Sequence, residues 1–322
     1  MPSGKFNLQK LHDEFMRQQE FVGRRSVETL RGYDASFKLL LTILPRIKIE
    51  DLTPEIMEKF FQILQKRERK VGNGKVKSGI TNSTVGTYRS KLNGFFKWLI
   101  ARGHLKKNPF DGIEYPKIAY EDRKYLSKSN VEKIIAGVIS QPNVDMLKRK
   151  RDLVMCYLLL NTGVRRGELL GLRLLDVDFD RAELFVNWKT SKGRKDRVIP
   201  INKQLMGVLK DYVSCRNSSK IKYTTPSLLV SSIADNPLTK HGLKHWVEEL
   251  KLRSGVNFHI HRFRHTFAMN LLHQGTDLAK LQYLLGHRNI KMTVQYLRCM
   301  PTQSVKADVE NLSIDGLLDY PN

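Results

Sequence analysis

Apolar side chains recur at helical spacing through most of the first hundred residues. Over residues 26–44 they fall three or four positions apart, Ser26 is placed to cap the segment, and Pro45 follows its end. Thr53 and Pro54 open another such segment with a capping side chain and a proline suited to a first helical turn. The pattern predicts an all-helical first domain of four to five helices, including 7–20, 26–44, one starting at 53, and 82–102.

A polar, basic stretch from Lys66 to Lys77 interrupts this helical pattern. It contains Gly72, Asn73 and Gly74, and we expect a surface loop that is either simply solvated or in contact with phosphate. Its glycines lack the GxxxxGK[ST] spacing of a nucleotide-binding phosphate loop, so we exclude that function.

The helical pattern stops at residues 108–112, which read Asn-Pro-Phe-Asp-Gly. The following residues carry mixed charge and include Pro116, a composition typical of a connector between domains. We therefore expect a first domain over 1–112, a linker over 113–125 and a second domain over 126–322.

Between residues 177 and 201 the apolar period changes from helical to that of strands. Segments 177–179, 183–186 and 197–201 are short, and turn-forming residues at 180–181 and 192–193 separate them. They predict one small three-stranded antiparallel sheet. The rest of the second domain predicts helices over 130–140, 147–161, 165–173, 202–214, 239–253, 263–274, 277–285, 290–299 and about 302–318. The expected fold class is mainly α.

Charge is the feature of the composition that bears most on function. Lysine and arginine outnumber aspartate and glutamate by 56 to 32 in 322 residues, a net charge of +24 that is spread along the chain. A basic soluble surface is one explanation, but a polyanionic partner fits better, because each neutralised phosphate releases counterions. An anionic membrane surface is less favoured, because no terminal segment is basic and amphipathic.

The remaining composition indicates a soluble protein of a reducing compartment. The three cysteines form no CxxC pair, and the longest apolar run, 153–160, is far too short to span a bilayer. The N-terminus lacks an apolar signal region. We expect a cytoplasmic protein associated with the nucleoid, with no membrane contact.

The chemistry concentrates in residues 261–265, His-Arg-Phe-Arg-His, with His287 and Tyr296 downstream. A guanidinium can bind two oxygens of one phosphate, and an imidazole can pass protons near neutral pH. A tyrosine hydroxyl is a nucleophile only when its proton is taken up and the attacked centre is electrophilic. These groups predict phosphoryl transfer to an enzyme tyrosine. His261 and His265 also read as HxxxH, but the adjacent arginines repel a divalent cation and no HExxH glutamate follows, so we expect no metal.

Two further segments carry candidates upstream. Arg165 follows a helix stop at Gly163, where helix N-terminal amides can also face an anion, and Glu168 lies one turn later to orient the guanidinium. This pattern is weak alone, because a surface Arg–Glu pair is more common. Lys192 lies at a predicted hairpin tip; most such lysines are only solvated, but a flexible tip can bring an ammonium to a leaving oxygen.

Together these segments resemble the tyrosine recombinase (phage integrase) family, in its simple two-domain, Xer-like form. The resemblance rests on Thr-Gly-Val-Arg-x-x-Glu-Leu at 162–169, Lys192 ahead of Val-Ile-Pro at 198–200, His-x-x-Arg-His at 261–265, Leu-Leu-Gly-His at 284–287 and Tyr296 nine residues later. Each motif is modest alone, but the ordered set covers the second domain and is specific. The basic helical first domain is similar to the family's SAM-like core-binding domain.

The resemblance implies a role for each of these side chains. Tyr296 attacks the scissile phosphate and leaves a 3′-phosphotyrosine and a free 5′-hydroxyl. Arg165 and Arg264 bind the non-bridging oxygens, where negative charge builds in the transition state. Lys192 is the general acid for the departing 5′-oxygen, although Lys189 and Lys195 lie close to it.

The resemblance also implies that His261 and His287 bind the phosphate or assist proton transfer, and which one serves Tyr296 as base stays open. Glu168 takes a supporting role. Because a phosphodiester is exchanged for a phosphotyrosine ester of similar energy, and cations stand in for metal ions, neither ATP nor a metal or other cofactor is expected. Further cations are candidates to contact the DNA backbone: Lys75, Lys77, Arg89, Lys97, Arg166, Arg194, Lys195 and Arg262.

As implied partners we expect double-stranded recombination sites and other copies of this chain, as a tetramer on two synapsed sites. The segment after Tyr296 packs either on a neighbouring subunit or within its own. The role as chromosome-dimer resolvase or as phage or mobile-element integrase stays open, as does any partner recombinase or accessory protein. Two alternatives are a type IB topoisomerase and a catalytically silent DNA-binding accessory protein; a metal hydrolase is a remote third.

Overall fold

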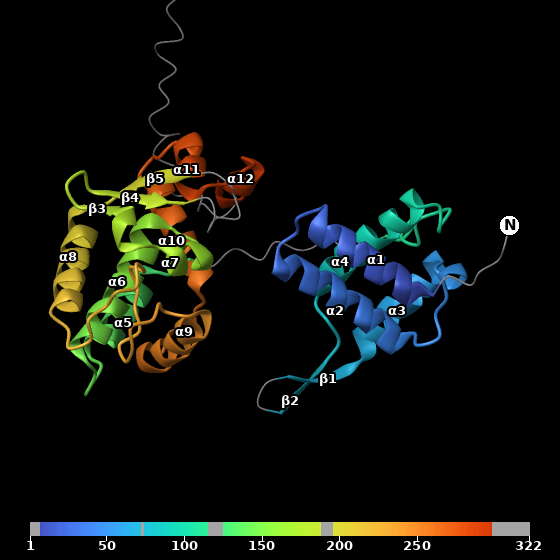
Figure 1. The fold of residues 1–322 in the computed structure, drawn as a ribbon, viewed down its shortest axis with the longest axis horizontal. Coiled ribbons are helices and arrows are strands. Elements are labelled where there is room, and N and C mark those ends of the chain that lie inside the picture. Colours follow the sequence, from blue (N-terminus) through green and yellow to red (C-terminus); the bar gives the residue numbers. More distant parts are fainter. Residues whose placement is uncertain (1–6, 72–73, 115–124, 188–195, 298–322) are drawn as a thin grey trace, which may run out of the picture. The chain divides into compact units, whose positions relative to one another are not determined.

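The computed structural model describes residues 7–71, 74–114, 125–187 and 196–297 of the chain. It divides the chain into two compact units, residues 1–120 and 121–322, which we call the N-terminal unit and the C-terminal unit. Both are mainly helical, as predicted (Figure 1). In the described ranges no helix is long and apolar enough to cross a membrane.

Four α-helices form the body of the N-terminal unit in its described residues, and the starts of two of them follow the predicted capping signals. The side chain of Ser26 accepts a hydrogen bond from Thr29 N, and that of Thr53 accepts one from Ile56 N. A short 3-10 turn, Ile49–Asp51, precedes the third helix. The helices are α1 (Leu8–Phe21), α2 (Val27–Ile43), α3 (Pro54–Lys66) and α4 (Asn82–Ala101).

The core of this unit is built around aromatic rings from α1, α2 and α4. Phe15, Phe37 and Phe95 are buried there, together with His12, which is 2% exposed. The His12 ring stacks on Phe37 with centroids 3.8 Å apart and planes 6° from parallel. Burial lowers the pKa of His12 to about 4, so this imidazole is neutral inside the core.

The prediction of a loop between α3 and α4 is wrong. Two segments there instead form a two-stranded antiparallel ribbon, β1 (Glu68–Val71) and β2 (Lys75–Ser78), in which Arg69 lies opposite Lys77. The ribbon extends away from the helices (Figure 1). Its described side chains are exposed, so its sequence carries none of the apolar alternation by which a half-buried strand is recognised.

The C-terminal unit is organised around one buried helix, α6. Leu158 and Leu159 of this helix are fully buried, and α5, α8 and α10 pack against it. The predicted three-stranded antiparallel sheet is confirmed, with strand order β3-β4-β5 and the buried pair Leu184 and Ile199 in register. The first elements are α5 (Lys128–Ile139), α6 (Met146–Thr162), α7 (Arg166–Gly171), a 3-10 turn (Leu174–Asp176), β3 (Val177–Asp178), β4 (Glu183–Val186) and β5 (Arg197–Pro200).

The last helices build a smaller cluster in which Tyr296 packs near Phe267 and Leu281. α10 begins three residues earlier than predicted, so His261 lies in its first turn. The predicted segment 302–318 lies outside the described residues. The helices are α8 (Lys203–Asn217), α9 (Lys240–Ser254), α10 (Ile260–His273), α11 (Leu278–Leu285) and α12 (Lys291–Leu297).

Candidate active site

Arg264 lies at the centre of the site, on the buried face of α10. Its Nη1 donates to the carbonyl of Gly163 at 2.6 Å, and its Nη2 donates to the carbonyl of Leu285. These carbonyls belong to the C-terminal ends of α6 and α11, where backbone oxygens have no partner within the helix. Arg264 therefore joins two helix ends that are more than a hundred residues apart in sequence.

The charge around Arg264 is not balanced. Burial, and next the nearby Arg165 guanidinium, lower the pKa of Arg264 to about 9. The side chain remains protonated at neutral pH, but a second cation beside it is unfavourable in a buried setting. Such a pair of guanidiniums is a favourable place for an anion with several oxygens.

Arg165 caps the N-terminus of α7 and is held from two sides. Its Nη1 donates to Oε1 of Glu168 at 2.9 Å, and its backbone N–H donates to Oε2 of the same carboxylate at 2.8 Å. Its Nη2 donates to the carbonyl of Gly286 at 3.1 Å. The orienting role that the sequence suggests for Glu168 thus has a direct geometric basis.

Arg197, at the start of β5, belongs to the same network, and sequence reasoning missed it. Its Nη1 and Nη2 donate to Oε1 and Oε2 of Glu168 at 3.2 and 2.7 Å, and its Nε donates to the carbonyl of Leu284 at 2.8 Å. Burial alone would raise the pKa of Glu168, but the hydrogen bonds and charge of Arg197, followed by those of Arg165, lower it to about 2. The only signal for Arg197 in the sequence was an arginine at the first position of an otherwise apolar strand.

His261 lies one helical turn before Arg264, on α10, and its side chain is exposed. Burial of part of the ring is the main cause that lowers its pKa, and the charges of His259, Arg264 and Arg166 act in the same direction. Because its pKa is lowered, the imidazole of His261 is neutral near pH 7. One of its ring nitrogens can then donate a hydrogen bond and the other can accept one.

Tyr296 lies on α12 and is 2% exposed. Its hydroxyl is 3.2 Å from Nδ1 of His265, and its ring is parallel to that of His287, with centroids 6.3 Å apart. Nδ1 of His287 lies 3.0 Å from Oγ1 of Thr293. The Tyr296 hydroxyl also acts to raise the pKa of Arg264.

His265 is a second residue that the predicted set lacks. It directly follows Arg264, and about 100° of rotation per residue carries its side chain to another face of α10, toward α12. In the sequence it stands out as the last residue of the His-x-x-Arg-His motif and as the second histidine of HxxxH, but neither pattern gave it a role of its own. Within the described ranges, no three His, Cys, Asp or Glu side chains lie together as potential metal ligands.

The other predicted residues are dispersed. Lys192, Arg194 and Lys195 lie outside the described residues. Arg166 is exposed beside Arg165, and Arg262 donates to the carbonyl of Asn257 at 2.9 Å. In the N-terminal unit the candidates lie on two elements, Lys75 and Lys77 on β2, and Arg89 and Lys97 on α4.

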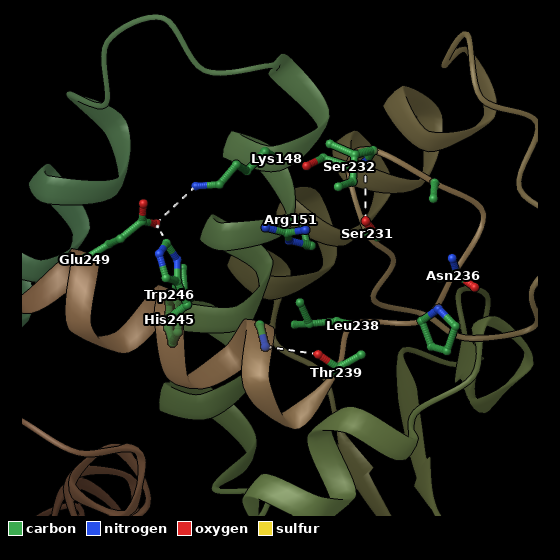
Figure 2. Close-up of a pocket in the computed structure, with 14 residues that line it drawn as sticks. Lys148, Arg151, Ser231, Ser232, Asn236, Leu238, Thr239, His245, Trp246 and Glu249 are labelled. Carbon is green, nitrogen blue, oxygen red and sulfur yellow. Dashed lines mark hydrogen bonds and ion pairs between the residues drawn. The ribbon is translucent and has the colours of Figure 1, made fainter.

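A pocket of about 650 Å³ lies elsewhere in the C-terminal unit. It is lined by Lys148 and Arg151 of α6, Trp246 of α9, and the loop before α9 (Figure 2). None of the predicted site residues that the structure describes lines it. This pocket is therefore separate from the arginines described above.

Comparison with known proteins identifies similar chains over both units. The profile of the Phage integrase family matches residues 124–302, and that of the Phage integrase SAM-like domain matches residues 7–118. The tyrosine recombinase XerC of Bacillus subtilis is 33% identical over 223 residues, which are 68% of this chain and 71% of that protein. A tyrosine recombinase of Pseudothermotoga lettingae is 29% identical over 93% of this chain and 96% of its own length.

Solved structures are similar in fold. The Tn1549 transposon integrase in complex with transposon right end DNA superimposes with a TM-score of 0.71 at 20% identity, covering 95% of this chain and 99% of that one. The XerH site-specific recombinase bound to a palindromic difH substrate, a post-cleavage complex, gives a TM-score of 0.71 at 15% identity, covering 96% and 90%.

Proposed function

The chain belongs to the phage integrase family, and we propose on that premise that it is a site-specific tyrosine recombinase. It cleaves and rejoins DNA strands through a 3′-phosphotyrosine intermediate. We assign DNA binding by the core-binding fold to residues 1–112 and catalysis to residues 126–322, with a linker over 113–125.

One observation supports this function above the others. Arg165 and Arg264 are held by the successive carbonyls of Gly286 and Leu285, and the Tyr296 hydroxyl contacts His265, the residue after Arg264 on α10. A guanidinium has five N–H donors, and the contacts described above use two of them in each arginine. The remaining donors can bind the non-bridging oxygens of a DNA phosphate.

In the proposed reaction the phenolic oxygen of Tyr296 forms a bond to phosphorus while the bond from phosphorus to the 5′-oxygen breaks. The proton of the phenol passes to a neighbouring base, and His265 and His287 are the imidazoles beside the Tyr296 ring. Lys192 supplies a proton to the departing 5′-oxygen. His261 hydrogen-bonds the phosphate as a neutral imidazole. Positioning and charge neutralisation carry the catalysis.

The assembly follows from the same proposal. The chain binds double-stranded recombination sites and acts as a tetramer on two synapsed sites, in the cytoplasm at the nucleoid. The segment after Tyr296 packs either on a neighbouring copy or within its own subunit. The exposed cations on β2 and α4 contact DNA phosphates, and Lys77 and Lys97 are exposed as this requires.

A covalent-capture experiment tests the function even while the target sequence is unidentified. The chain is mixed with a library of nicked duplexes, from which the short strand beyond the cleavage point diffuses away and leaves the enzyme attached. We expect a DNA-linked band on denaturing gels in the presence of EDTA, loss of this band in Tyr296→Phe with DNA binding retained, and a shared sequence in the captured DNA.

Each rival function has its own outcome. Relaxation of supercoiled plasmids without recombinant products would indicate a type IB topoisomerase. DNA binding without any covalent adduct would indicate an accessory protein. Loss of cleavage in EDTA would indicate a metal-dependent hydrolase.

A further inference from the structure

Three arginines from three separate segments converge on the last turn of α11. The consecutive carbonyls of Leu284, Leu285 and Gly286 accept hydrogen bonds from Arg197, Arg264 and Arg165, respectively. The C-terminal end of a helix carries a partial negative charge of about half a unit, and its last carbonyls lack partners within the helix. The last turn of α11 therefore holds the three guanidiniums in place and partly offsets their positive charge.

Arg197 differs from the other two arginines in how much of its guanidinium is engaged, because three of its nitrogens donate hydrogen bonds, against two in Arg165 and two in Arg264. Its side chain is 2% exposed and donates to Glu168 and to the Leu284 carbonyl, whereas the Arg165 side chain is 16% exposed. A Cβ on Gly286 would lie 2.9 Å from Nη1 of Arg197, so the helix end and this guanidinium are in close contact. Arg197 is thus poorly placed to bind DNA itself.

The carboxylate of Glu168 connects Arg197 to Arg165. Each carboxylate oxygen accepts two hydrogen bonds. Oε1 accepts from the guanidiniums of Arg165 and Arg197, and Oε2 accepts from the Arg197 guanidinium and the backbone N–H of Arg165. Because Arg197 holds both oxygens, it determines the orientation in which Glu168 meets Arg165.

We propose that Arg197 is a positioning residue for strand cleavage, which acts through Glu168 and the end of α11 to fix the Arg165 guanidinium. This inference rests on the proposed recombinase function. Arg197 is also the first residue of β5, the strand that follows the segment containing Lys192. Its hydrogen bond to the Leu284 carbonyl connects β5 to the C-terminal end of α11, which lies just before His287. A misplacement of about 1 Å in such a group costs about 100-fold in rate.

The test uses the full chain and a nicked duplex carrying the sequence recovered by covalent capture. Removal of Arg197 alone leaves a buried carboxylate without its main partner and risks unfolding. The informative variants are therefore the double variant Arg197→Met with Glu168→Gln, which removes both charges of the buried pair, and Glu168→Gln, whose folding is verified by circular dichroism because it leaves Arg197 without its counter-charge. Arg197→Lys is the conservative variant.

We expect Arg197→Lys to fold and to bind the duplex with unchanged affinity, but to form the covalent complex about 100-fold more slowly under single-turnover conditions. A lysine keeps the charge but lacks the planar fork that engages both oxygens of Glu168 and the Leu284 carbonyl together. A loss confined to the cleavage step is not expected from a general weakening of the fold.

The double variant shows whether Arg197 acts through Glu168. If it does, Arg197→Met adds less than about a twofold loss to the rate of Glu168→Gln, because the connection is already broken. If the two losses multiply instead, Arg197 acts independently of the carboxylate and the proposal is overturned. An unchanged cleavage rate in Arg197→Lys overturns it equally.

A matched control lies in the same unit. Arg151 is a buried arginine that donates to the buried Asp152 and to the carbonyl of Val230, at 2.8 and 2.9 Å. Arg151→Met with Asp152→Asn removes a similar ion pair away from the cluster and should leave the ratio of cleavage rate to DNA affinity unchanged. If the wild-type chain captures no DNA at all, the recombinase function itself fails, a result distinct from every outcome above.

Discussion

The hydroxyl of Tyr296 lies 3.2 Å from Nδ1 of His265, and the tyrosine is almost completely buried. The side chain proposed as the nucleophile is thus engaged by a residue of a neighbouring helix. Attack on phosphorus requires this oxygen to exchange its imidazole contact for the phosphate. We expect this contact to shield the hydroxyl from reagents in solution.

Protection of Tyr296 can be measured by chemical nitration. His265→Ala removes this hydrogen-bond partner and opens space beside the ring, so we expect Tyr296 to be nitrated several times faster than in the wild-type chain. Mass spectrometry of the peptide identifies the modified residue. Tyr212, which is fully buried and donates to the carbonyl of Leu228, is the internal control and should stay protected in both chains. Equal nitration of Tyr296 in both chains would contradict the role assigned to His265.

Two glycines that end helices differ in what surrounds them. Gly163 and Gly255 both have positive φ, 58° and 65°, but a Cβ on Gly163 would lie 2.4 Å from the Phe267 ring, whereas one on Gly255 meets nothing within 4 Å. Gly255→Ala should cost about 1 kcal/mol of unfolding free energy from backbone strain alone. Gly163→Ala should cost about 1–3 kcal/mol more, because the ring must move. Chemical denaturation compares the two, and similar costs would refute the crowding at Gly163.

The buried His12 makes the N-terminal unit sensitive to acid. Its pKa is lowered to about 4 by burial, with Asp34 and Asp13 opposing this shift and Lys38 adding to it. The unfolded chain, with a histidine pKa of about 6.5, binds the proton more tightly, so stability is full above that pH and is lost toward pH 4. We expect a loss of about 2 kcal/mol at pH 5.

His12→Phe should remove this loss of stability in acid while keeping a ring stacked on Phe37. Hydrogen exchange of the α1 and α2 amides, followed from pH 7 to pH 5 with correction for intrinsic exchange rates, measures the effect in the full chain. If the opening free energy of the variant falls from pH 7 to pH 5 as steeply as that of the wild type, His12 is excluded as the cause.

The β1–β2 ribbon should contribute to DNA affinity through charge. Arg69 and Lys77 lie opposite each other and are exposed, an arrangement that repels unless anions lie nearby. A two-stranded ribbon also fits the major groove of DNA. Replacing both with alanine should reduce the slope of log affinity against log salt concentration by about 2 on a random-sequence duplex. The matched double alanine variant of the exposed Lys203 and Lys210 on α8 should leave the slope unchanged, and equal slopes for all three chains would contradict this contribution.

The sequence predicted those parts of the fold that carry periodic burial. The helices and the three strands of the small sheet follow from spacing along one element. The ribbon did not follow, because its exposed, charged strands have no buried face to impose alternation. Arg197 and His265 did not follow either, because their partners, Glu168 and Tyr296, are brought to them by tertiary packing.

The arginine cluster is held largely by main-chain oxygens, and this has a consequence for protein engineering. A carbonyl is present whatever the side chain, so the last turn of α11 keeps its contacts when the outward positions of the helix change. Ala279 and Lys280, both exposed on α11, are therefore suitable positions for introducing labels or altered surface chemistry, whereas Gly286 must remain without a side chain.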